Sequence, residues 1–161
     1  MELKAKGLLK QYTAGNICAR ENELNQLKAQ ELGLTDEVFQ VKWMNFDMLD
    51  AEDDESYDVI FASDCFLHSK CKSTLALNLA RILAKGGVIV FTDIIEKEDA
   101  CPQMLQGIYH RLHLSSLGTA STYGRDFTNA GLTKESITFP TEQLIGHYSK
   151  VKYLAMTEKR E

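Results

Sequence analysis

YDVIFASDCFLHS, at residues 57–69, and LARILAKGGVIVFTD, at residues 79–93, are the two stretches that decide the fold. Each contains a short, nearly continuous apolar run, at residues 57–62 and 87–92, that is rich in β-branched and aromatic side chains. Continuous short runs of this kind are typical of strands that are buried on both faces, as in a parallel sheet. The two stretches therefore predict neighbouring parallel strands.

Outward from these strands, the apolar pattern alternates between strand and helix periods. The alternating run at residues 38–43 predicts another strand, and weaker signals predict strands at 12–17 and 135–139. Helical spacing of apolar residues predicts helices at 21–32, 72–84, 103–114 and 123–130, with Gly33, Gly86–Gly87 and Gly131 as stops. Strands that alternate with helices predict an α/β fold with a parallel sheet. No repeat or Pro-rich linker divides the chain, so we expect one domain over residues 1–161.

Composition excludes several classes of partner and site. The formal net charge of −5 and the absence of a Lys/Arg-rich run argue against a nucleic-acid partner. No apolar run is long enough to span a membrane, and lysines interrupt the N-terminal apolar residues, so we expect no secretory leader. The four cysteines form no C-x-x-C pair and have no histidine at zinc spacing. We therefore expect free thiols, no metal site and a cytoplasmic protein.

Ligands of open parallel sheets bind beyond the carboxyl ends of the strands. This rule nominates the residues that follow each predicted strand. They are residues 16–19, 45–47 and 63–68 together with Asp93.

In their order and spacing, the two opening stretches resemble the second half of a class I S-adenosylmethionine-dependent methyltransferase domain. The resemblance extends over residues 8–152 and is greatest to the sarcosine/dimethylglycine N-methyltransferases, including the stretches AGLTKESITF (130–139) and GHYSKVK (146–152). The turn at residues 84–87 keeps the family's glycines but lacks its usual proline. The resemblance implies a Rossmann-like methyltransferase sheet, S-adenosylmethionine as cofactor, and N-methylation of a small amine such as sarcosine or dimethylglycine in glycine betaine synthesis.

The resemblance also implies roles for the cofactor-binding residues. Asn16 and Ile17 correspond to the end of the family's second strand, where a polar side chain meets the ribose, although Asn16 is equally suited to capping a helix. Asn45 and Phe46 correspond to the loop that holds the adenine, with a core position as the alternative for Phe46. The remaining residues of this set correspond to the floor beneath the sulfonium, where carbonyls and a carboxylate stabilise a cation; they are Ser63, Asp64 and Cys65.

For the substrate, the resemblance implies three further residues. His68 corresponds to a histidine that orients the amine or meets the substrate's carboxylate, with a purely structural histidine as the alternative. His147 and Tyr148 fall in a segment that resembles the family's substrate-covering region, where a tyrosine ring can contact a methylated ammonium. His68, Asp64 and Tyr148 are the candidate catalytic residues. In-line methyl transfer depends mainly on alignment, so it requires no nucleophile–base pair.

One family motif is absent from the sequence. The family begins with a strand and an acidic-x-Gly-x-Gly-x-Gly loop, whereas Gly7 and Gly15 are the only glycines before Gly33. Residues 1–9 resemble the tail of the helix that follows this loop. We therefore expect a sheet truncated at its N-terminal side, without the first strand and glycine loop, and truncated at its C-terminal side as well.

Loss of a central strand leaves two inner sheet edges unpaired. The sequence leaves three outcomes open: the sheet closes up, a second copy of the chain supplies the strand in a homodimer, or the domain is only marginally stable. It also leaves open an inactive remnant that acts as a binding or dimerisation module. A dehydrogenase-type nucleotide-binding domain is disfavoured because no G-x-G-x-x-G is present.

Overall fold

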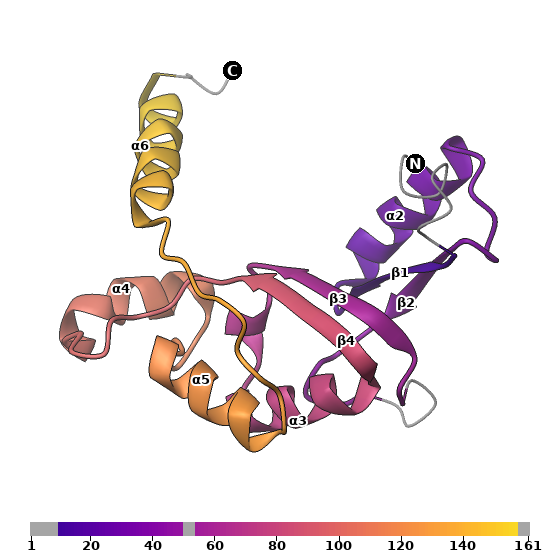
Figure 1. Cartoon of the computed structure of the whole chain (residues 1–161). Helices are drawn as coiled ribbons and strands as arrows, with labels where there is room; N and C mark the ends of the chain where they lie inside the picture. Colours follow the sequence, from indigo (N-terminus) through magenta and orange to yellow (C-terminus); the bar gives the residue numbers. More distant parts are fainter. Residues whose placement is uncertain (1–9, 50–53, 158–161) are drawn as a thin grey trace.

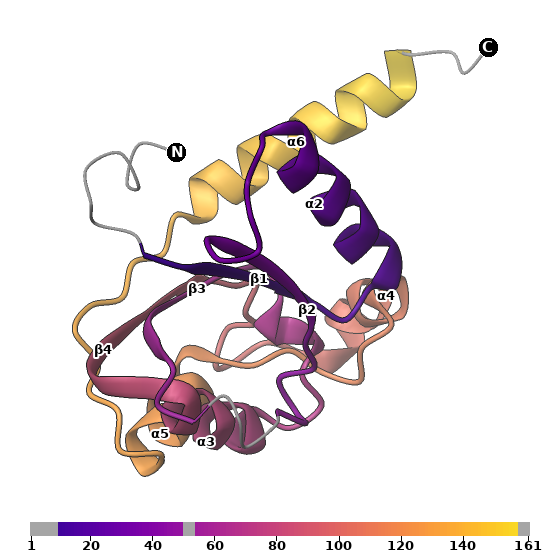
Figure 2. The same cartoon turned by 90° about the vertical axis from the view of Figure 1, so that its right-hand side faces the viewer.

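Parallel strands alternate with helices along the chain, as the sequence predicts. The computed structural model describes residues 10–49 and 54–157. The elements, in chain order, are β1 (Tyr12–Asn16), α2 (Ala19–Glu31), β2 (Phe39–Trp43), β3 (Tyr57–Ser63), the short 3-10 helix η2 (Phe66–His68), α3 (Lys72–Ile82), β4 (Leu83–Thr92), α4 (Pro102–Leu112), α5 (Ala120–Asn129) and α6 (Thr141–Thr157). Figures 1 and 2 show their arrangement. The α/β class and the truncated methyltransferase-type sheet are confirmed.

The four strands form two separate parallel pairs. β1 pairs with β2 in the register Tyr12 to Phe39, and β3 pairs with β4 in the register Ile60 to Ile89. Within the described residues, no ladder connects one pair to the other. Of the three outcomes that the sequence leaves open, a sheet that closes up is therefore not the one observed.

The main core lies on one face of the β3–β4 pair. Ile60 and Ala62 of β3, together with Ile89 and Phe91 of β4, pack toward α3 and α5 (Figure 1). The fully buried side chains beneath them are Phe66, Leu75, Leu79 and Ile82. Burying a side chain of this size contributes about 2 kcal/mol to folding. This layer holds the larger of the two hydrophobic clusters among the described residues, and the burial of Phe66 in it fixes the position of the turn that follows β3.

The opposite face of the β3–β4 pair is uncovered. Val59 and Phe61 of β3 are 64% and 67% exposed, and their register partners Val88 and Val90 of β4 are 48% and 50% exposed. We call these four residues the open sheet face. Strands of a parallel sheet are usually covered on both faces, so this surface is unusual for the fold class.

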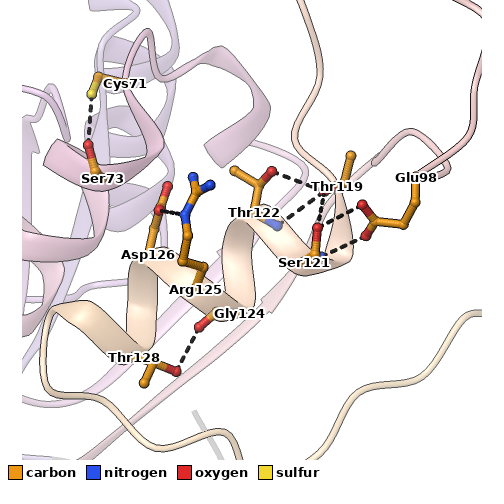
Figure 3. A network of polar contacts seen from close by, with 10 residues as sticks. All are labelled: Cys71, Ser73, Glu98, Thr119, Ser121, Thr122, Gly124, Arg125, Asp126 and Thr128. Atoms are coloured by element: carbon orange, nitrogen blue, oxygen red, sulfur yellow. Dashed lines mark hydrogen bonds and ion pairs between the residues drawn. The ribbon is translucent and has the colours of Figure 1, made fainter.

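Helix α5 is fixed at its beginning by polar contacts. The side-chain oxygen of Thr119 accepts the N–H of Thr122, as an N-cap does. The carboxylate of Glu98 accepts both the N–H and the hydroxyl of Ser121 (Figure 3). These contacts position the helix that carries Tyr123 against the core.

Several sequence predictions require correction. Residues 135–139 are not a strand, because this stretch has no partner strand in the described part of the chain. β4 begins at Leu83 rather than at residue 87: the helix ends at Ile82, and the strand continues through the glycines with a register shift. α6 was not predicted as a helix. The resemblance of residues 1–9 to a helix tail concerns residues outside those described.

Candidate functional site

The polypeptide turns sharply at the carboxyl ends of β3 and β4. Asp64 has a left-handed backbone (φ 48°), and its N–H donates to the carbonyl of Thr92 over 2.8 Å. Aspartate tolerates this conformation better than most residues. The hydroxyl of Thr92 lies 3.3 Å from both the hydroxyl of Ser63 and the carboxylate of Asp64. An exposed carboxylate is thereby held at the strand end, where the sequence predicts a ligand.

His68 lies at the end of η2. Phe66 and Leu67 are buried, whereas the His68 side chain is exposed. The N–H of Leu67 donates to Asp93 Oδ1 over 3.2 Å, which ties this turn to the end of β4. The burial of two residues and this hydrogen bond fix the backbone from which the imidazole projects.

Lys72 stabilises the same turn through hydrogen bonds to its backbone. Its ammonium group donates to the carbonyls of Phe66, Leu67 and Ser69 at 2.8, 3.0 and 2.9 Å. Burial lowers the pKa of Lys72, and the nearby Asp93 and Asp47 partly offset this shift. No sequence signal predicts this role, because a lysine at the start of a helix is ordinarily exposed.

Asp93 and Tyr123 complete this buried polar cluster. The Tyr123 hydroxyl donates a short hydrogen bond to the Asp93 carboxylate, and the Lys72 ammonium lies 5.9 Å from the centre of the Tyr123 ring. Burial raises the pKa of Asp93, while the hydrogen bonds from Tyr123 and Leu67 act in the opposite direction. Burial, followed by the contact with Asp93, raises the pKa of Tyr123 well above its ordinary value. The sequence nominated Asp93 by its place after a strand but missed Tyr123.

The loop after β2 lies against the turn after β3. The carboxylate of Asp47 accepts hydrogen bonds from the Ser69 hydroxyl and, over 2.9 Å, from the Lys70 N–H. The side chain of Asn45 accepts the N–H of Asp47 over 3.0 Å, so Asn45 shapes this loop. The Phe46 ring packs edge-on against Phe66, with ring centres 5.3 Å apart. Phe46 thus contributes to the core, which was the alternative to an adenine contact.

Asn16 and Ile17 follow β1. The side chain of Asn16 accepts the N–H of Cys18 over 2.9 Å, just before α2; the N-cap of that helix is Cys18, and no side chain caps it, so Asn16 does not act as the cap. The Ile17 side chain is exposed, and its carbonyl accepts the indole N–H of Trp43. The Oδ1 of Asn22 nearby is buried without a hydrogen-bond partner among the described residues, while its amide donates to the Asn16 carbonyl. An unused acceptor therefore lies close to this strand end.

The remaining predicted residues lie in two different places. Cys65 is half-buried at the strand end beside Asp64, and burial raises the pKa of its thiol. His147 and Tyr148 lie instead on α6, with their rings edge-on at 5.3 Å. α6 projects away from the strands in both views (Figures 1 and 2). Within the described contacts, the two rings pair with each other and Tyr148 also contacts Arg111 of α4, whereas neither contacts His68.

Two kinds of site are absent from residues 10–49 and 54–157. No group of three or more His, Cys, Asp or Glu side chains is placed to hold a metal ion. None of the helices in these ranges is long and apolar enough to cross a bilayer.

Comparison with known proteins identifies the family. A family model described as a methyltransferase domain matches residues 1–91. The chain belongs to this methyltransferase family. A sarcosine/dimethylglycine N-methyltransferase of Halorhodospira halochloris is 34% identical over 140 residues, which are 85% of this chain and 48% of the relative. One from Aphanothece halophytica is 36% identical over 137 residues, covering 84% of this chain and 48% of the relative.

Solved methyltransferase structures agree with this assignment. A crystal structure from Galdieria sulphuraria, assigned to the sarcosine dimethylglycine methyltransferases, matches 97% of this chain and 61% of its own, with a TM-score of 0.82 and 28% identity. A geranyl diphosphate C-methyltransferase of Streptomyces coelicolor shares the fold alone, with a TM-score of 0.73 at 14% identity over 86% of this chain and 49% of its own. The chain spans about half the length of the curated relatives that it matches.

Proposed function

We propose that this chain carries part of the active site of an S-adenosylmethionine-dependent N-methyltransferase that acts on a small amine such as sarcosine or dimethylglycine, in glycine betaine synthesis. The observation that carries the proposal is the fixed turn after β3, which presents the Asp64 carboxylate and the His68 imidazole at one strand end. The names of the relatives that match most of the chain support the substrate class.

The strand ends offer groups that suit the cofactor. The proposed contacts are Asn16, Ile17, Asn45, Phe46, Ser63, Asp64 and Cys65. The buried Oδ1 of Asn22, without a donor among the described residues, would suit a ribose hydroxyl near Asn16. The carboxylate of Asp64 would suit the positive charge of the sulfonium. When bound, S-adenosylmethionine supplies an electrophilic methyl group. The fit is incomplete, because residues 10–49 contain no glycine-rich loop for the methionine portion.

The chain's own residues would align the substrate rather than act covalently. His68 is exposed on a turn whose backbone is held by Lys72 and Asp93, so its imidazole can orient an amine or meet a carboxylate. Tyr148, with His147 beside it, would cover the substrate if α6 closed over the strand ends. Alignment of this kind, with water excluded, is the main source of rate in methyl transfer.

The division of the sheet supports a further part of the proposal. β1 and β3 belong to pairs that no ladder joins in the described part of the chain. A strand between them would satisfy both inner edges, and a second copy of the chain in a homodimer is one source of that strand. The free thiols of Cys18, Cys65, Cys71 and Cys101 support a cytoplasmic location.

Calorimetric titration with S-adenosylhomocysteine tests the cofactor site. We expect binding in the micromolar range, lost in Asp64→Ala and retained in Asp99→Ala, an exposed aspartate outside the strand-end turn. With sarcosine and labelled S-adenosylmethionine, His68→Ala should lose methyl transfer more than cofactor binding. A protein that melts cooperatively but binds no ligand at millimolar concentration would sink the proposal.

The unjoined strand pairs and the open sheet face favour one alternative function: an inactive domain that serves as a binding or dimerisation module. A stable dimer that fails to bind S-adenosylhomocysteine would select this alternative.

A further inference from the structure

Two carboxylates from different strand pairs hold the residues on either side of His68. Before the histidine, Leu67 donates its N–H to Asp93, which follows β4. After the histidine, Ser69 donates its hydroxyl to Asp47, which lies in the loop after β2. The turn that carries His68 therefore depends on both strand pairs for its shape, although along the chain it follows β3.

Asp47 makes two hydrogen bonds to this turn, one with each carboxylate oxygen. Oδ1 accepts the Ser69 hydroxyl, and Oδ2 accepts the N–H of Lys70 over 2.9 Å. Hydrogen bonds to a carboxylate are roughly twice as strong as those between neutral groups. Because the two bonds start from one rigid group, they fix both the distance and the angle between the loop and the turn. A movement of the loop is therefore transmitted to the backbone beside His68.

The loop after β2 has contacts of its own that do not use the Asp47 carboxylate. The side chain of Asn45 accepts the backbone N–H of Asp47 over 3.0 Å. The carbonyl of Phe46 accepts the side-chain amide of Asn78 on α3 over 2.8 Å. Removal of the carboxylate therefore leaves these contacts in place. It disconnects the loop from the turn without removing the groups that shape the loop.

The division of the sheet makes this connection important. In the part of the chain that the structure describes, no ladder joins the β1–β2 pair to the β3–β4 pair. The first pair can thus shift relative to the second without breaking hydrogen bonds between strands. The hydrogen bonds of Asp47 cross from the first pair to the turn after β3, so they take over part of the role that a continuous ladder has in an undivided sheet.

We propose that Asp47 is a positioning residue that couples cofactor binding at the ends of β1 and β2 to the placement of His68. This inference rests on the proposed function, in which the cofactor contacts the loop after β2. A cofactor that fixes this loop also fixes Ser69 and Lys70 through the Asp47 carboxylate, and the imidazole beside them is then aligned with the amine. Because coupling between two sites is reciprocal, the amine tightens cofactor binding by the same factor.

Calorimetric titration of the full chain with S-adenosylhomocysteine, with and without saturating sarcosine, measures the coupling. In the wild type, we expect sarcosine to lower the dissociation constant of S-adenosylhomocysteine at least about fivefold, the lower end of typical couplings. In Asp47→Ala, the affinity without sarcosine should stay close to that of the wild type, because the loop keeps its other contacts. The effect of sarcosine should fall below about twofold in this variant.

Three further variants separate positioning from a general loss of structure. Asp47→Asn should retain most of the coupling, because its carbonyl can accept the Lys70 N–H while its amide donates to the Ser69 hydroxyl. Ser69→Ala removes one of the two hydrogen bonds and should give an intermediate coupling. Asp36→Ala is the matched control: this exposed aspartate precedes β2, at the other end of the strand, and its replacement should leave the coupling unchanged. Circular dichroism checks that each variant is folded, and Ser69→Ala decides the matter if Asp47→Ala is not.

Different results would overturn the inference and the proposed function. A wild type that binds S-adenosylhomocysteine with an affinity unchanged by sarcosine would overturn the inference alone. Coupling that persists in folded Asp47→Ala and Ser69→Ala would mean that the two ligands are coupled without this carboxylate. A loss in Asp47→Asn as large as in Asp47→Ala would exclude positioning by these two hydrogen bonds, and a loss in Asp36→Ala would point to a general effect on the fold. A folded wild type that binds no S-adenosylhomocysteine would overturn the proposed function and the inference with it.

Discussion

Replacing Tyr123 by phenylalanine removes a single hydroxyl from the polar cluster beneath the His68 turn. That hydroxyl donates to the Asp93 carboxylate, which is half-buried between the end of β4 and α5. A hydrogen bond to a charged group contributes about 1.5–3 kcal/mol, more than one between neutral groups. Because the Leu67 N–H still reaches the same carboxylate, we expect a loss of about 2 kcal/mol in the free energy of unfolding.

Thermal and urea unfolding, followed by circular dichroism at neutral pH, measure this loss. For a chain of this length, 1 kcal/mol corresponds to about 2–4 °C in Tm, so Tyr123→Phe should melt about 4–8 °C below the wild type. Tyr153→Phe is the control, because its ring is exposed on α6. The deficit should shrink in acid, since a protonated Asp93 gains less from the hydroxyl than the carboxylate does. A melting temperature within about 1 °C of the wild type would refute this account of the cluster.

Three other predictions concern single residues. Burial raises the folded-state pKa of Asp93 above its ordinary value of 3.8, so stability should fall as the pH rises through that raised pKa. Asp93→Asn should remove this fall. Urea midpoints of the wild type that change with pH, from about pH 3 to 8, no more than those of the variant would contradict the prediction. Hydrogen bonds from Ser73 and Thr74 lower the pKa of Cys71 to about 7. Iodoacetamide labelling should therefore titrate near neutrality, and in Ser73→Ala the midpoint should move up; an unchanged midpoint counts against the Ser73 contact. Gly87→Ala places a Cβ 2.9 Å from the Asp58 carbonyl and should lower the free energy of unfolding by about 1–3 kcal/mol. An unchanged urea midpoint would contradict this prediction and mean that the strands shift to admit the methyl group.

Strand propensity predicted most of the fold, although only one face of the β3–β4 pair is buried. The runs at β3 and β4 are apolar on both sides, and the glycines at 33 and 131 end helices in left-handed conformations. Residues 135–139 alternate between polar and apolar side chains but have no partner strand in the described part of the chain, and pairing depends on the rest of the sheet. α6 was missed because its apolar residues, among them Ile145, Val151 and Leu154, lie on several sides of the helix, and none of its residues is buried.

The position of the candidate site was predictable from the sequence, but the residues that hold its backbone in place were not. The rule for parallel sheets selects Asp64 and His68 from the chain order alone. Lys72 could not be found in this way, because its role depends on three backbone carbonyls that converge only when η2 has formed. For Phe46, position in the sequence leaves two roles open, because an aromatic residue after a strand can contact an adenine or pack in the core. Only the structure shows the core contact, in which the ring packs against Phe66.

The division of the strands into two pairs also affects how the molecule unfolds locally. The β1–α2–β2 unit buries little beyond Ala29 and Met44, whereas β3, α3 and β4 share a core with four fully buried side chains. Without a ladder between the pairs, the first unit can unfold while the second stays intact, as separate foldons do. Amide hydrogens of β1 and β2 should exchange with solvent through this local opening, far faster than those of β3 and β4. A ligand that spans the ends of both pairs would therefore join them into one cooperative unit, so ordering of the first foldon would accompany binding.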